Sequence, residues 1–146
     1  MANWCLRLAG IYLLVGMSMG IGMGAAQNLA LAAAHAHLNL LGWATLALAA
    51  LVFTVWPRTS ATRTARAFFW LYNLALPLGM LALSLELLGH TQWMPVIIVG
   101  QLALFAAAML FVATVLVSLR GDPAAAARST VAGVRRQAAE AIADAG

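Results

Sequence analysis

His35 and His37 are the two side chains of this sequence best suited to chemistry, and a single residue separates them. They lead directly into a largely apolar helical stretch that begins at Leu38. Imidazole is the commonest side chain for holding a metal ion, and it also binds haem iron. Ionisable side chains at membrane depth are costly, so the few that occur there usually have a function. We therefore expect this histidine pair to hold a metal or a haem.

The spacing of the pair predicts two half-sites rather than one shared site. On an α-helix, residues two apart differ by about 200° in direction and point to nearly opposite faces. His35, Asn39 and Gly42 fall on one face, and His37 and Leu41 fall on the other. Each imidazole must look toward a different neighbour, which can be another helix, another subunit or a cofactor. A six-coordinate haem fits this arrangement, because it takes one imidazole on each side of its plane, and Gly42 would leave room for a flat macrocycle.

The composition predicts an all-α membrane protein. Of the 146 residues, 64% are hydrophobic and 8% are charged, whereas a soluble domain has about 25% charged residues. Crossing a bilayer takes about 20 apolar residues. Four transmembrane helices are expected, at about 6–26, 34–56, 67–88 and 93–119. The first run lacks a convincing cleavage site, so we interpret it as a retained helix and not as a signal peptide.

The distribution of arginines predicts the orientation. The eight basic residues are all arginines that flank the apolar runs on one side: Arg7, Arg58, Arg63, Arg66, Arg120, Arg128, Arg135 and Arg136. The two loops on the other side contain no lysine or arginine. The positive-inside rule then makes both termini cytoplasmic, in a multi-pass protein of a bacterial inner (plasma) membrane. The calculated pI near 10.7 is explained by this topology, and no nucleic-acid partner is expected.

The chain divides into a four-helix transmembrane domain at 1–120 and a tail at 121–146 that is rich in alanine and arginine. Asp122 can cap a helix, with Pro123 at its first position. Apolar side chains then recur at helical spacing among charged ones. We expect a short amphipathic helix in the cytoplasm or at the membrane interface.

Residues 35–43, His-Ala-His-Leu-Asn-Leu-Leu-Gly-Trp, follow a first helix rich in glycine and methionine. This pattern resembles short four-helix membrane proteins related to subunit I of haem–copper oxidases and nitric oxide reductases. Those large subunits arrange three four-helix repeats about a pseudo-threefold axis. The resemblance implies that His37 is a low-spin haem ligand and that His35 faces a second site. It also implies a homotrimer, with haem b between neighbouring second helices.

The sequence departs from that family where oxygen chemistry is concerned. The further histidines of the oxidase copper site are absent, and neither Tyr12 nor Tyr72 stands in a matching context. The predicted outer loops lack the arginines that neutralise haem propionates. Reduction of dioxygen or nitric oxide is therefore unsupported, and any enzymatic activity would be oxidoreductase-like. Haem binding for electron transfer or gas-ligand sensing is the expected function, with the redox partner left open.

Two alternatives have residues of their own. Met19 and Met23 form a Met-x-x-x-Met motif that resembles the copper-coordinating motif of trimeric copper transporters. Thioethers select Cu(I), so a copper-binding or copper-transport protein that uses these methionines and the histidines is the first alternative. The second is a non-catalytic membrane assembly factor in which the histidines are structural.

Four further side chains carry weaker signals. Cys5 is expected to be a small buried hydrophobe, and Asn73 to form an interhelical hydrogen bond. Glu86, the one acid inside a predicted span, could relay protons or sit at the headgroups, and His90 in the outer loop could be exposed or an accessory ligand. The glycines of the first run, spaced by four, are expected to form a helix-packing face: Gly16, Gly20 and Gly24.

Overall fold

The structure is a computed structural model, and it describes residues 1–119, 131 and 133. The chain divides into two units, Met1–Val115 and Leu116–Gly146. The helix expected in the tail at 121–146 lies outside the described residues, apart from Val131 and Gly133, which are helical. All the long helices of the described residues begin within the first unit.

All regular elements in the described residues are helices, and four stretches are long and apolar enough to cross a membrane: Ala2–Ala26, Ala32–Val55, Arg63–Leu87 and Thr91–Ser118. The predicted all-α fold with four spans is confirmed for this part of the chain. The first and third helices begin a turn earlier than hydropathy predicted. Hydropathy locates the apolar part of a helix, whereas backbone hydrogen bonding continues into its polar first turn.

Three of the spans are single helices: α1 (Ala2–Ala26), α5 (Arg63–Leu87) and α6 (Met94–Leu119). The second span is composite. It begins as α2 (Ala32–His37), continues as the π-helix η1 (Leu38–Thr45) and ends as α3 (Leu46–Val55). The short helices α4 (Pro57–Ser60) and η2 (Thr91–Trp93) complete the described elements.

Local sequence explains how the spans begin and end. α1 ends at Ala26, and the residue that follows, Gln27, takes the left-handed conformation with φ 48°. α5 starts where the Thr62 hydroxyl accepts a hydrogen bond of 3.1 Å from the backbone N–H of Ala65. Pro77 lies inside α5 without ending it, as expected for a membrane helix, and Pro95 lies in the first turn of α6.

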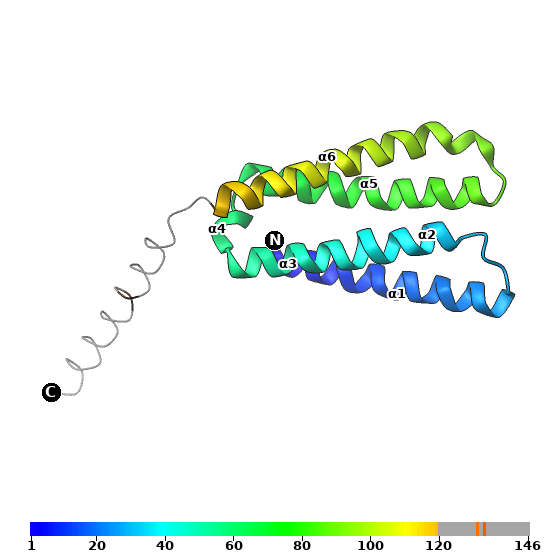
Figure 1. The fold of residues 1–146 in the computed structure, drawn as a ribbon, viewed down its shortest axis with the longest axis horizontal. Helices are drawn as coiled ribbons and strands as arrows, with labels where there is room; N and C mark the ends of the chain where they lie inside the picture. Colours follow the sequence, from blue (N-terminus) through cyan, green and yellow to red (C-terminus); the bar gives the residue numbers. More distant parts are fainter. Residues whose placement is uncertain (120–130, 132, 134–146) are drawn as a thin grey trace, which may run out of the picture. The chain divides into compact units, whose positions relative to one another are not determined.

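The first unit is built from two helix pairs (Figure 1). α1 runs along η1 and α3, while α5 approaches α6 at two glycines. The pairs meet in an aromatic cluster, in which Phe68 of α5 packs against Phe53 of α3, Phe111 of α6 and Tyr72. Cys5 is fully buried in the same core, as predicted.

Candidate functional site

The glycine face of α1 receives the histidine-bearing segment of the second span. A Cβ atom built on Gly20 would lie 2.8 Å from Cε1 of His35, and one built on Gly16 would lie 2.7 Å from the amide of Asn39. One turn further along, a Cβ on Gly42 would lie 2.7 Å from Cβ and Cγ of Tyr12. Over three successive turns, therefore, a side chain of one helix fills the space beside a glycine of the other.

This contact confirms that His35, Asn39 and Gly42 share one helix face, and it adds that the face is turned toward α1. It also corrects one expectation. The room beside Gly42 is filled by the ring of Tyr12 from the same chain, so Gly42 does not leave a slot there for a macrocycle. Gly24 takes no part in the packing face, since a Cβ built on it would meet nothing within 4 Å.

His35 is tied across the helix pair through one ring nitrogen. Its Nδ1 lies 2.8 Å from the backbone oxygen of Gly16. A carbonyl oxygen can only accept a hydrogen bond, so Nδ1 carries the proton and the lone pair of the neutral ring is on Nε2. The amide of Asn39 donates to the backbone oxygen of His35 at 3.0 Å. The Asn39 amide nitrogen also lies 3.4 Å from Nδ1, but the shorter contact to Gly16 favours the tautomer with the proton on Nδ1.

His37 has the same tautomer but a different partner. Its Nδ1 lies 2.7 Å from the backbone oxygen of Ala33, one turn earlier in its own helix. By the same argument Nδ1 donates and the lone pair is on Nε2. The bond ties the ring to α2 alone, and the side chain is half-buried. Histidines that bind metals usually donate the other ring N–H to a carbonyl or carboxylate in this way.

The histidines stand immediately before the π-helix, which the sequence reasoning missed. The carbonyls of η1 accept two side-chain hydrogen bonds, from Thr45 to Leu40 at 2.9 Å and from the Tyr72 hydroxyl to Leu41 at 2.9 Å. π-helices are rare in proteins, and those that occur are often found at functional sites. Hydropathy and helical period carry no signal for one, and the residues around Tyr72 in the sequence give no sign of its contact with the second span.

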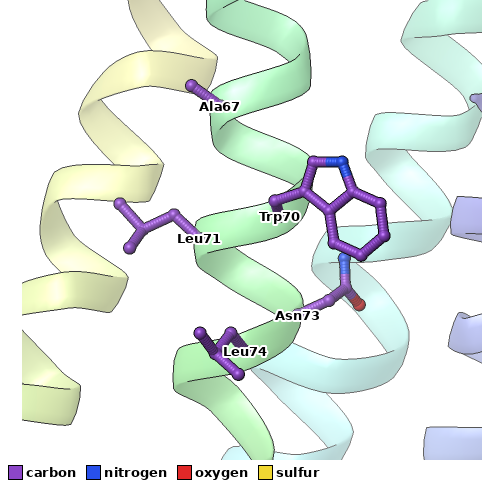
Figure 2. A pocket seen from close by; sticks show the side chains of 5 residues that line it. All are labelled: Ala67, Trp70, Leu71, Asn73 and Leu74. Atoms are coloured by element: carbon purple, nitrogen blue, oxygen red, sulfur yellow. The ribbon is translucent and has the colours of Figure 1, made fainter.

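A shallow groove of about 480 Å³ lies on α5, lined by Ala67, Trp70, Leu71, Asn73 and Leu74. Figure 2 shows that all five side chains come from this one helix. None of them is of a type that binds haem iron. Neither His35 nor His37 is among the residues that line it.

Asn73 corrects an expectation as well. Its amide donates to the backbone oxygen of Phe69 in its own helix, at 2.8 Å, instead of bridging to another helix. Short polar side chains commonly bond back to the preceding turn. Its Oδ1 is buried without a hydrogen-bond partner in the part of the chain that the structure describes.

The remaining candidates differ in their burial. Met19 packs partly buried against the core, and Met23 is half-buried. Glu86 is half-buried, with its Oε2 lacking a partner among the described residues, and His90 is exposed in the loop before η2. Within residues 1–119, 131 and 133, no three His, Cys, Asp or Glu side chains gather where they could hold one metal ion.

Comparisons with known proteins supply no assignment. No protein-family model, no curated protein and no solved structure matches this chain.

Proposed function

We propose that this chain is a haem-binding integral membrane protein that uses histidine-ligated haem b for electron transfer or gas-ligand sensing. The observation that carries the proposal is the hydrogen bond that each histidine makes through Nδ1. His35 and His37 each place Nδ1 against a backbone carbonyl, at 2.8 and 2.7 Å. In both rings the lone pair is then on Nε2, which is the atom that would bind iron.

His37 is the primary ligand in this proposal. Its hydrogen bond to Ala33 stays within α2. His35 is packed on Gly20 and bonded to Gly16, so it also holds the second span against α1. Asn39 and Gly42, predicted as cofactor-binding residues, act indirectly here by fixing the same helix contact.

The proposed assembly is a homotrimer, by resemblance to one repeat of a haem–copper oxidase. His35 faces α1, whereas His37 is anchored to its own helix, so one chain does not bring the two rings to one iron. Each haem would take one histidine from each of two subunits. The trimer rests on fold-level analogy, and the histidine tautomers support the ligand assignment independently of it.

The proposed topology has both termini in the cytoplasm of a bacterial cell, with the histidines nearer the outer side. Its support is the position of four exposed arginines: Arg7, Arg58, Arg63 and Arg66. They stand at the start of α1 and between α3 and the first turn of α5. The connections at the other end, 27–31 and 88–90, contain no lysine or arginine.

Bound haem would supply a one-electron couple or, with one axial position open, a site for a gas ligand. The protein's part is to fix the tautomer and orientation of the imidazoles. A carbonyl that accepts the Nδ1–H bond also raises the electron donation from Nε2. Apolar side chains around the histidines would limit the access of water to the iron and so influence its redox potential.

The test is an absorption spectrum of the full-length protein purified in detergent, together with the iron and copper content per chain. The proposal predicts a Soret band, sharp α and β bands after reduction, and iron in proportion to the haem. Copper without Soret absorbance would instead indicate the Met19 and Met23 alternative. Absence of both would leave the histidines structural, as in an assembly factor.

A further inference from the structure

The second span changes its helical hydrogen bonding directly after the histidines. Residues Leu38–Thr45 form a π-helix eight residues long, whereas most π-helices are single-turn bulges inside α-helices. A π-helix bonds each N–H to the carbonyl five residues earlier, so each residue turns the chain by less than the roughly 100° of an α-helix. Through this difference, η1 sets the direction in which α2 faces relative to α3.

Both histidines belong to α2, the helix whose direction η1 sets. His37 is the last residue of α2, and His35 is one turn from the start of η1. If residues 38–45 became an α-helix while α3 stayed packed, α2 would rotate about the helix axis. His35 would then leave the gap at Gly20, and His37 would face a different neighbour.

A wide helical turn is unfavourable in isolation, so side chains that bond its carbonyls matter. The Thr45 hydroxyl donates to Leu40 from within the π-helix itself. The Tyr72 hydroxyl donates to the backbone oxygen of Leu41 at 2.9 Å, and it does so from α5. Tyr72 thus connects the π-helix to the second helix pair.

Tyr72 is itself held in place. Its side chain is 2% exposed, and its ring centroid lies 5.3 Å from that of Phe68. A buried hydroxyl without a partner is costly, so the hydroxyl has reason to keep its acceptor. The acceptor, the backbone oxygen of Leu41, faces the Tyr72 hydroxyl only while residues 38–45 keep their present backbone conformation.

We propose that Tyr72 is a positioning residue that keeps residues 38–45 in the π-helix and so sets the directions of His35 and His37. Its role for haem rests on the function proposed above. Its role for the helix does not, and the two can be measured separately.

The experiment compares Tyr72→Phe with Tyr12→Phe, which also keeps its ring but whose hydroxyl is not bonded to the second span. Amide hydrogen exchange is measured for peptides covering residues 38–46 in detergent-solubilised protein. Losing one buried hydrogen bond should speed exchange there by about tenfold in Tyr72→Phe, and leave it unchanged in Tyr12→Phe. Thr45→Val should act in the same direction, whereas Thr45→Ser, which keeps the hydroxyl, should not.

The haem readout is the low-spin electron paramagnetic resonance signal, which reports the orientation of the axial imidazoles. Tyr72→Phe should keep its haem but shift this signal, and Tyr12→Phe should not. Faster exchange in a protein without haem would support the helix role and refute the proposed function. Unchanged exchange and an unchanged signal in Tyr72→Phe would overturn the positioning role, even if the wild-type protein binds haem.

Discussion

The two helix pairs of the first unit use glycine for different purposes. Between α1 and the second span, glycines leave gaps that are filled by the side chains of His35, Asn39 and Tyr12. Between α5 and α6, Gly79 and Gly100 bring two backbones together, and a Cβ built on Gly100 would lie 3.1 Å from Cα of Gly79. The first pair is shaped around polar and aromatic side chains, whereas the second is shaped for close helix packing alone.

The interface between α1 and the second span holds polar groups that close helix packing does not require. Polar groups in a membrane-spanning interface are expensive unless they are bonded. The first pair contains a histidine, an asparagine and a π-helix whose backbone carbonyls accept hydrogen bonds from side chains. The α5–α6 contact carries no such group at its two glycines. Substitutions at the glycines can therefore test whether the two interfaces differ as described.

The largest effect is expected for Gly42→Ala. The new Cβ would lie 2.7 Å from Cβ and Cγ of Tyr12, atoms too close to the backbone to rotate away. The helices would have to separate, at a cost of about 1–3 kcal/mol in the free energy of unfolding. Reversible unfolding in mixed micelles measures this. The double variant Tyr12→Ala/Gly42→Ala should recover part of the loss, and no recovery would mean that the clash is elsewhere.

A smaller and more local effect is expected for Gly20→Ala. The clash would be with Cε1 at the far end of the His35 ring, at 2.8 Å. The ring can turn aside, but it then loses its bond to Gly16, worth about 1 kcal/mol. Nitrogen chemical shifts of labelled histidine should change for His35 and stay constant for His37. Equal changes in both rings would contradict the separate anchoring of the two side chains.

Alanine substitutions in the second pair should change the stability less, and in opposite directions at the two glycines. A Cβ on Gly79 would be in ordinary contact at 3.8 Å, whereas one on Gly100 would be crowded at 3.1 Å. Gly79→Ala should gain roughly 0.5–1 kcal/mol of helix stability. Gly100→Ala should lose more than that gain to crowding. The thermal midpoints of the two variants give the comparison, and a reversed order would disprove the described contact.

The smallest effect is expected for Gly24→Ala. Gly24 continues the spacing of Gly16 and Gly20, but a Cβ there meets nothing within 4 Å. Substitution should raise the thermal midpoint slightly and leave the His35 nitrogen shifts unchanged. A loss of stability as large as that of Gly20→Ala would show that all three glycines share one interface.

The sequence was sufficient for the spans and for one face of the site. Long apolar runs locate the membrane helices, and the α-helical period placed His35, Asn39 and Gly42 together. The glycine spacing groups Gly24 with Gly16 and Gly20, and this grouping is wrong. The second span begins only at Ala32, and a Cβ on Gly24 would meet nothing within 4 Å. That boundary depends on the turn at Gln27 and the residues that come after it.

The π-helix and the tautomers could not be predicted, because they depend on contacts between distant residues. Tyr72 lies 31 positions from Leu41 in the sequence, and Gly16 lies 19 positions from His35. Likewise, only the fold shows that the ring of Tyr12 fills the space beside Gly42. Periodicity describes one helix at a time and carries no information about which helix supplies a donor.

The central claim is that His37 binds haem iron through Nε2, and two matched variants test it most directly. Haem content and the reduced spectrum are measured for His37→Ala and for His90→Ala, which removes an exposed imidazole from the loop before η2. Loss of the sharp low-spin bands in His37→Ala, with an unchanged spectrum in His90→Ala, is the predicted result. Full haem content and an unaltered spectrum in His37→Ala would contradict the claim.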